Sequence, residues 1–199
     1  MKKIVVLGAG LIGKAIAVDL AKSFEVTAVD INPSELEKFN KYENISTQIA
    51  DLADVEEFNQ VVKDFDLVIG ALPGYMGYNA VKQSILAGKD IIDISFFREE
   101  PYDLDQLAKE KNVTAIIDAG IAPGMGNVIL GYHNERMQVN SYKCYSGGLP
   151  FKREWPYEYK AVFSPMDVLE KYTRHARYVL NGEMFVRKAL SEDELEYFE

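Results

Sequence analysis

Cysteine and histidine are scarce in this chain of 199 residues, and long apolar runs are absent. A single cysteine, Cys144, cannot form an internal disulfide, which is typical of proteins from a reducing, cytoplasmic compartment. The two histidines, His133 and His175, lie far apart with no cysteine or histidine at ligand spacing, so no metal site is predicted. No apolar run approaches the ~20 residues that a membrane-spanning helix needs.

Acidic residues outnumber basic ones, 31 to 22, which gives a net charge of −9. An acidic chain of this kind is a poor partner for nucleic acid or an anionic membrane surface. The nucleophile turn of the hydrolases and the phosphate-binding loop of the P-loop kinases are both missing, which disfavours those two classes. What remains is an ordinary globular composition, with 48% hydrophobic and 27% charged residues.

The first 125 residues alternate between short apolar runs and stretches of helical period. Strands are expected at 3–7, 25–30, 45–50, 66–71, 90–94 and 113–118. Helices are expected near 11–22, 34–40, 54–63, 76–87 and 102–110. Strands joined by helices predict right-handed crossovers, so residues 1–125 should form an α/β Rossmann domain with a doubly wound, parallel, six-stranded sheet.

A different pattern follows residue 125 and predicts a partial α+β domain over 126–199. Residues 141–149 suggest a strand that ends in a Gly-Gly turn. Two short apolar runs, 178–180 and 184–186, flank Asn181-Gly182, which is a strong hairpin signal. We interpret this part of the chain as a substrate-binding or dimerisation domain.

A glycine-rich hexapeptide directly follows the first predicted strand and opens the first predicted helix: Gly8-Ala9-Gly10-Leu11-Ile12-Gly13. Gly8 permits a tight turn, Gly10 lets the backbone approach a diphosphate, and Gly13 lets the helix pack close to the strand. The helix N-terminus then offers free N–H groups and the positive end of its dipole to the phosphates. The pattern predicts a dinucleotide site; the alternative is that the glycines only form a turn.

Asp30 ends the second predicted strand, where a carboxylate accepts hydrogen bonds from the adenosine ribose and repels a 2′-phosphate. The next residues, 31–34, contain no arginine or lysine. The sequence therefore favours NAD over NADP. The competing interpretation is that Asp30 only caps the end of the strand.

Two further loops follow predicted strands at the same edge of the sheet. Asp51 and Leu52 follow the third strand and either flank the adenine ring or form a helix-capping loop. Ala71, Leu72 and Pro73 follow the fourth strand, beside the expected diphosphate and nicotinamide ribose, although Pro73-Gly74 is equally a common turn sequence.

Asp93 and Asp118 end the fifth and sixth predicted strands, where the nicotinamide ring and a substrate should meet. Either carboxylate can bind a substrate amine or accept a proton, and either can simply cap the next segment. Basic residues occur at Lys160 and from Arg174 to Arg177. An arginine fork there can bind a carboxylate, or these residues form a solvated charged face.

The residues quoted above and several later stretches resemble the saccharopine dehydrogenase family, particularly its lysine 6-dehydrogenase-like members. The resemblance also rests on Asp93-Ile94-Ser95, Asp118-Ala119-Gly120-Ile121-Ala122-Pro123-Gly124, Gly147-Gly148-Leu149-Pro150, Tyr159-Lys160, Val162-Phe163-Ser164, Asn181-Gly182 and Ala189-Leu190-Ser191. It implies a pyridine-nucleotide oxidoreductase that acts on the C–N bond of a basic amino acid or a related secondary amine.

The resemblance also implies where the site residues lie. It puts Asp93 and Asp118 near the nicotinamide as candidate catalytic groups. It puts Gly148 and Lys160 in the substrate domain. We expect Lys160 to be a further candidate catalytic residue, and Gly148 and Arg177 to bind substrate. Family members are usually longer, so the chain is expected to be a short form or a fragment, with a partner chain, as in a homodimer, covering the sheet surface left open.

Two other functional hypotheses remain at this stage. A non-catalytic NAD(H)-binding module would sense redox state or regulate a partner. A dehydrogenase of a semialdehyde or hydroxy acid would use the same fold, but Cys144 is in the wrong place for such chemistry.

Overall fold

The structure of the chain is a computed structural model that describes residues 1–148, 150–156, 158–160, 168–169 and 172–191. It divides into two compact units, Met1–Cys144 and Tyr145–Glu199. Each unit is described by itself below.

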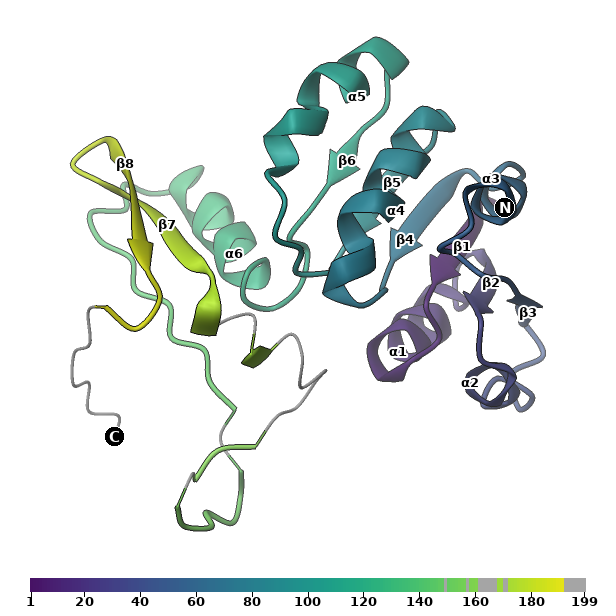
Figure 1. Ribbon diagram of the computed structural model, residues 1–199, viewed down its shortest axis with the longest axis horizontal. Helices are drawn as coiled ribbons and strands as arrows, with labels where there is room; N and C mark the ends of the chain where they lie inside the picture. The colour runs from purple at the N-terminus through teal and green to yellow at the C-terminus, as the bar shows by residue number, and fades with distance from the viewer. Residues whose placement is uncertain (149, 157, 161–167, 170–171, 192–199) are drawn as a thin grey trace. The chain divides into compact units, whose positions relative to one another are not determined.

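Unit 1 is built on a six-stranded parallel sheet, which confirms the predicted fold class (Figure 1). Its strands are β1 (Lys3–Leu7), β2 (Glu25–Asp30), β3 (Ile45–Ile49), β4 (Leu67–Gly70), β5 (Asp90–Asp93) and β6 (Ala115–Ile116). Their order across the sheet is β3-β2-β1-β4-β5-β6. The order in which strands are added to the sheet reverses between β1 and β4. In such sheets, ligands bind in the crevice at the carboxyl ends of the strands that flank this point.

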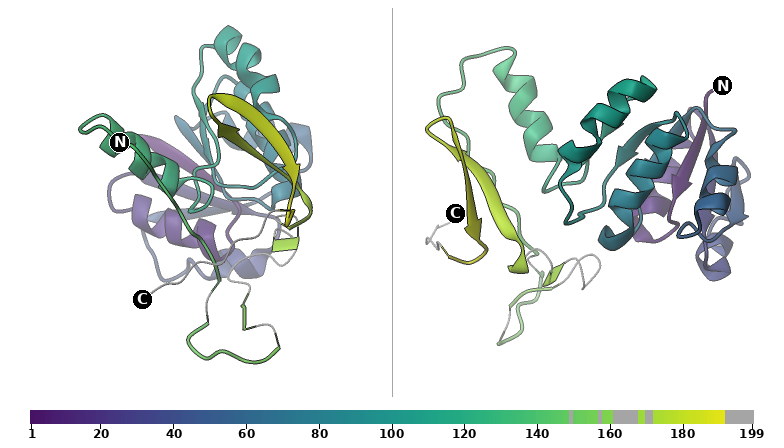
Figure 2. Two further views of the ribbon diagram at one scale, coloured as in Figure 1. Left: turned by 90° about the vertical axis from the view of Figure 1, so that its left-hand side faces the viewer. Right: turned by 45° about the horizontal axis from the view of Figure 1, so that its top comes forward.

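Helices cover both faces of this sheet (Figures 1 and 2). They are α1 (Leu11–Leu20), α2 (Pro33–Glu37), α3 (Val55–Val62), α4 (Gly74–Leu86), the 3-10 turn η1 (Pro101–Leu104) and α5 (Asp105–Lys111). A further helix, α6 (Met125–Asn134), follows β6 in the chain. Alternate residues of β1 enter two separate cores, because successive side chains of a strand point to opposite faces. Ile4 and Val6 pack with Phe39, whereas Val5 and Leu7 pack with Phe58.

The last strand is shorter than expected, since β6 comprises only Ala115 and Ile116 instead of residues 113–118. Its partner β5 ends at Asp93, and Asp118 adopts a left-handed φ of 52°, so the ladder cannot continue. The helix α6 was not anticipated from the sequence, because Gly126 and Gly131 weaken its helical signal.

Unit 2 contains the predicted hairpin, with β7 (His175–Leu180) and β8 (Glu183–Lys188) paired antiparallel on either side of Asn181-Gly182.

The strand expected at 141–149, across the boundary between the two units, was wrong: none of residues 141–148 lies in a strand. Part of this segment instead folds back on α6, where the Tyr142 hydroxyl donates to the Gly126 carbonyl at 2.8 Å. Leu149 lies outside the described residues.

A substitution at Gly13 tests how closely α1 packs against the preceding turn. A Cβ at residue 13 would lie 1.9 Å from the Gly8 carbonyl oxygen, so the backbone would have to move. We expect Gly13→Ala to lower the free energy of unfolding by about 1–3 kcal/mol, because the clash outweighs the better helix propensity of alanine. Urea denaturation measures this change.

Gly10→Ala is the matched control, because no heavy atom lies within 4 Å of a Cβ at residue 10. Its unfolding free energy should stay within about 0.5 kcal/mol of the wild type. Equal losses in the two variants would contradict the close approach at Gly13.

Candidate functional site

The glycine-rich turn lies at the carboxyl end of β1, next to the point where the strand order reverses. Gly8 has a φ of +95°, a conformation that favours glycine, and its N–H donates to the Val29 carbonyl at 2.8 Å. Gly10 is the N-cap of α1, and no side chain caps this helix. The turn therefore presents backbone N–H groups at a helix N-terminus with open space above Gly10, which suits a diphosphate.

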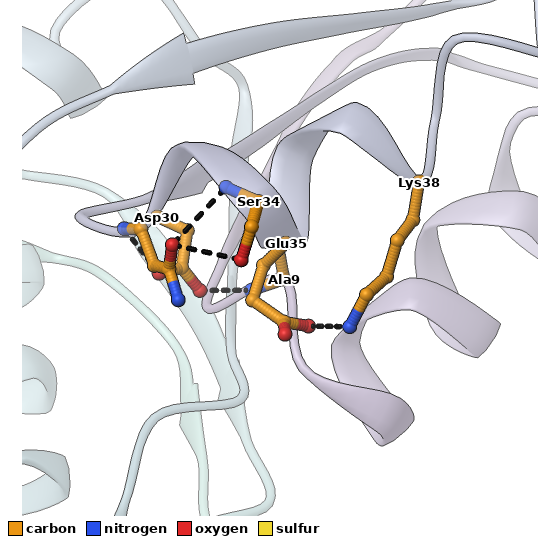
Figure 3. Close-up of polar contacts among 6 residues, drawn as sticks. Ala9, Asp30, Ser34, Glu35 and Lys38 are labelled. Carbon is orange, nitrogen blue, oxygen red and sulfur yellow. Dashed lines mark hydrogen bonds and ion pairs between the residues drawn. The ribbon is translucent and has the colours of Figure 1, made fainter.

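Asp30 ties this turn to the end of β2 (Figure 3). Its Oδ2 accepts from the Ala9 N–H at 2.8 Å, and its Oδ1 accepts from the Asn32 N–H at 2.9 Å. A carboxylate oxygen can accept more than one hydrogen bond, so each oxygen keeps capacity for a ribose hydroxyl. Asp30 thus caps its strand end and keeps acceptors for a further donor.

The segment after Asp30 offers no compensating positive charge. The Asn32 side chain caps α2 by accepting from the Ser34 N–H at 3.1 Å. Lys38, at the end of α2, forms an ion pair with Glu35 at 2.5 Å, as Figure 3 shows. Lys38, the one cation among residues 31–38, is therefore already paired with a carboxylate.

Residues 71–73 lie directly beside the glycine turn. A Cβ at Gly8 would lie 2.5 Å from the Ala71 carbonyl oxygen, so the loops after β1 and β4 are in contact. Leu11 and Ile12, the first residues of α1, are 80% and 50% exposed. Leu72 is partly buried against the core, and Pro73 is the N-cap of α4. The predicted cofactor residues of β1, β2 and β4 thus come together at one edge of the sheet.

Asp51 and Leu52 have clear structural roles. Leu52 is only 6% exposed and belongs to the core beneath α3. The Asp51 side chain accepts from the Ala53 N–H at 2.9 Å, which stabilises the loop that leads into α3. Contact of this loop with an adenine ring stays a prediction.

Asp93 is fully buried at the end of β5. Its Oδ1 accepts from both the N–H and the hydroxyl of Ser95, while its Oδ2 has no hydrogen-bond partner. Burial raises the pKa of this carboxyl from 3.8 to about 6, with a smaller contribution from the negative charge of Asp118; the Ser95 hydrogen bonds oppose the shift. Asp93 can therefore change its charge near neutral pH.

Asp118 is partly buried and follows β6, in the loop whose Ala119 N–H donates to the Asp93 carbonyl at 3.0 Å. The structure thus brings the two predicted carboxylates of β5 and β6 near one another. Asp118 is the more accessible of the two. A left-handed φ at a non-glycine residue is uncommon and is often found at functional sites.

Gly148 and Lys160 are neighbours within unit 2. The Lys160 N–H donates to the Gly148 carbonyl at 3.4 Å, and a Cβ at Gly148 would lie 2.5 Å from the Lys160 carbonyl oxygen. The Lys160 side chain is exposed. Arg177 lies in β7. The catalytic role expected for Lys160 and the substrate roles expected for Gly148 and Arg177 stay predictions.

Sequence reasoning missed the part played by Ser95 and Gly70 in holding Asp93. Gly70 pairs with Asp93 across β4 and β5, and a Cβ there would lie 1.9 Å from Asp93 Oδ2. The Asp-x-Ser spacing was a usable signal for the Ser95 contact, since aspartate often accepts from the N–H two residues later. The Gly70 contact depends on strand register, which no local pattern reveals.

Within the described ranges, no group of three or more histidine, cysteine, aspartate or glutamate residues is arranged to hold a metal ion. The same part of the chain contains no helix of the length and apolarity needed to cross a membrane.

The strand order, the glycine turn and the acid after β2 define a Rossmann-type α/β unit, followed by a smaller unit with an antiparallel hairpin. Two family models match: the saccharopine dehydrogenase NADP binding domain over residues 4–116, and the saccharopine dehydrogenase C-terminal domain over residues 120–198. The chain therefore belongs to the saccharopine dehydrogenase family. The resemblance inferred from the sequence is confirmed.

Curated relatives are similar over almost the whole chain. The mitochondrial alpha-aminoadipic semialdehyde synthase of Bos taurus is 28% identical over 92% of this chain and 21% of its own length. The saccharopine dehydrogenase (NADP(+), L-glutamate-forming) of Pyricularia oryzae is 25% identical over 92% of this chain and 43% of its own length. The chain thus spans less than half the length of either relative.

Solved structures share the fold. Saccharopine dehydrogenase (L-Glu forming) from Saccharomyces cerevisiae covers 94% of this chain and 44% of its own, with a TM-score of 0.69 and 20% identity. Scyllo-inositol dehydrogenase from Lactobacillus casei, solved with NAD(H) and scyllo-inositol, covers 70% of this chain and 42% of its own, with a TM-score of 0.53 and 18% identity.

The buried Asp93 predicts a specific pH dependence of stability. Its pKa is about 6 in the folded chain, above the ordinary 3.8 of an aspartate, so ionisation lowers the stability of the folded state as the pH rises from about 4 to about 7. The unfolding free energy of the wild type minus that of Asp93→Asn should fall by about 2.4 kcal/mol from pH 4 to pH 7. Denaturant titrations at each pH measure it.

Asp103→Asn serves as the control, because Asp103 is exposed in η1. Its difference from wild type should change little over the same range. A wild type minus Asp93→Asn difference that rises with pH would contradict the raised pKa.

Proposed function

We propose that this chain binds NAD(H) at the carboxyl edge of its parallel sheet and carries the nucleotide-binding part of an oxidoreductase. The observation that carries the proposal is the joined pair of groups at this edge: the uncapped N-terminus of α1 and Asp30, linked through the Ala9 N–H. The first group suits a diphosphate and the second a ribose diol, at the separation that the turn sets. The exposed Leu11 and Ile12 provide apolar contact beside them.

The proposed preference for NAD differs from the names of several relatives. The matching family model is described as NADP binding, and the Pyricularia relative is named for NADP(+). In this chain Asp30 occupies the end of β2, and the nearby Lys38 is paired with Glu35. A 2′-phosphate would meet the Asp30 carboxylate without a free cation to offset it, whereas a 2′-hydroxyl would donate to it.

The reaction we propose is the oxidation of a C–N bond in a basic amino acid or a related secondary amine, or its reverse. The bound nicotinamide supplies the hydride acceptor or donor. Asp118, the more accessible carboxylate, binds the protonated amine and accepts a proton from it. Asp93 is a positioning residue, because its buried carboxyl changes charge near pH 6 and so alters the field at Asp118.

Unit 2 carries the residues for which the sequence predicts roles in substrate binding or catalysis. Lys160 and Arg177 are cations that can bind a substrate carboxylate. The Gly148 carbonyl accepts a hydrogen bond from the Lys160 backbone N–H, which ties these two residues together.

Cofactor selectivity tests the role of Asp30. Asp30→Ala should weaken NADH binding by about 1–3 kcal/mol, because charge-assisted hydrogen bonds are lost. It should also raise the affinity for NADPH relative to NADH, because a repulsive charge is removed. Calorimetry with both nucleotides gives the ratio, which a general loosening of the turn would not change.

Asp19→Ala is the control, since Asp19 is an exposed residue on α1 that pairs with Lys22. Its affinities should match the wild type. An unchanged NADH affinity in Asp30→Ala would remove this carboxylate from the site.

Turnover tests the proposed reaction. Incubation of the chain with NAD and a panel of basic amino acids and their secondary-amine derivatives should produce the absorbance of NADH. Asp118→Asn should reduce the rate by about 10²–10⁴-fold while NADH affinity stays near wild type, because a general acid–base group is lost. NADH binding without turnover of any substrate in the panel would instead support the non-catalytic binding module.

A further inference from the structure

The carboxyl of Asp93 lies on the face of the sheet that α4 covers. Val68 of β4 and Ile91 of β5 pack in the same core as Val81 of α4. Alternate residues of a strand face the same way, so Asp93, two residues after Ile91, also faces α4. An apolar side chain is the usual occupant of such a position, and here it is a fully buried acid whose Oδ2 has no hydrogen-bond partner.

Two glycines make room for this carboxyl and for its partner Ser95. A Cβ at Gly70 of β4 would lie 1.9 Å from Asp93 Oδ2. A Cβ at Gly77 of α4 would lie 1.8 Å from Ser95 Oγ. Because the Ser95 hydroxyl donates to Asp93, the two side chains form one buried polar unit against β4 and the start of α4.

The same two glycines lie on either side of the loop that contacts the glycine turn. Gly70 directly precedes Ala71, whose carbonyl oxygen would lie 2.5 Å from a Cβ at Gly8. Residues 71–73 lead into α4, and none of them carries a charge. The Asp93 carboxyl therefore adjoins both the strand and the helix that hold this loop, at the edge of the sheet where we propose that the diphosphate binds.

The charged groups around Asp93 do not favour its ionisation. β4 and the first turns of α4 carry no charged side chain, and their titratable groups are the phenols Tyr75 and Tyr78. The charged residues of the loop after β5, at 98–100, are exposed or partly exposed. Asp118, in the loop after β6, is a negative charge that adds to the raised pKa of Asp93. Ionisation of Asp93 therefore adds a second negative charge to this edge.

We propose that the binding of NAD(H) is linked to proton uptake by Asp93, so that the chain binds the dinucleotide more tightly when this carboxyl is neutral. The inference rests on the proposed function, which puts a diphosphate at the start of α1. Like charges repel more strongly where the surroundings exclude water, and the Asp93 carboxyl is fully buried. Binding and protonation are reciprocal, so a bound dinucleotide should raise the pKa of Asp93.

Affinity for the dinucleotide should fall as the pH rises through the pKa of Asp93. Burial sets this pKa at about 6 in the free chain. At lower pH the carboxyl is neutral in both the free and the bound chain, so the affinity is at its highest. At higher pH the free chain loses its proton before the complex does, and binding must then restore the proton or tolerate the charge. The affinity levels off above the higher pKa of the complex.

Calorimetry with NADH measures this linkage directly. Between pH 5.5 and pH 7.5 the dissociation constant of the wild type should rise by about 3- to 10-fold. At pH 6.5, titrations in two buffers of different ionisation enthalpy should show net uptake of protons on binding.

Asp93→Asn removes the titrating group while keeping its shape. Its NADH affinity should not depend on pH over this range, its binding should take up no proton through residue 93, and at pH 7.5 it should bind NADH more tightly than the wild type. A purely structural role for Asp93 would instead weaken binding at every pH. Asp103→Asn, an exposed change of the same kind in η1, should keep the pH dependence of the wild type.

Carbon-13 NMR of the aspartate carboxyls tests the linkage in the wild type, without relying on the folding of any variant. The Asp93 resonance should titrate near pH 6 in the free chain and at a higher pH in the complex with NADH.

An NADH affinity that is the same from pH 5.5 to pH 7.5 would overturn the proposal. So would an Asp93 pKa that NADH does not raise, or an Asp93→Asn variant with the pH dependence of the wild type. Absence of NADH binding at every pH is a separate result, which would overturn the proposed function and this inference together.

Discussion

The hydrogen bond from the Ala9 N–H to the Asp30 carboxylate is the contact on which the nucleotide site depends. It joins the loop after β1 to the end of β2, so the two loops that would hold the diphosphate and the ribose keep a fixed separation. The contact uses the carboxylate without exhausting its acceptors. In the proposed function, the same charge would also repel a phosphate on the ribose.

The Asp93 carboxyl differs from that of Asp30 in its burial and in its hydrogen bonds. Asp30 is partly exposed and hydrogen-bonded through both oxygens, whereas Asp93 is buried with one oxygen unpartnered. An unpartnered buried carboxylate is costly, which is why its pKa rises to about 6. Two acids at the same edge of one sheet therefore differ: Asp30 is a hydrogen-bonded, partly exposed acceptor, whereas the charge of the buried Asp93 depends on pH near neutrality.

Much of this fold could be predicted because its determinants are local. The apolar runs of β1, β2 and β4 are buried on both faces, and the glycine turn and Asp30 occur at fixed positions after their strands. The hairpin followed from Asn181-Gly182. The early end of β6 and the burial of Asp93 depend instead on contacts between strands, such as that between Gly70 and Asp93. Residues 141–148 have strand-like composition, but a strand forms only with a partner.

The central claim is that the turn after β1 and the acid after β2 together bind a dinucleotide. A crystal structure of the chain with NADH tests this claim most directly. The account predicts the diphosphate within hydrogen-bond distance of the backbone N–H groups at the start of α1, and a ribose hydroxyl donating to Asp30. A crevice filled by side chains, or NADH bound at another place on the molecule, would contradict it.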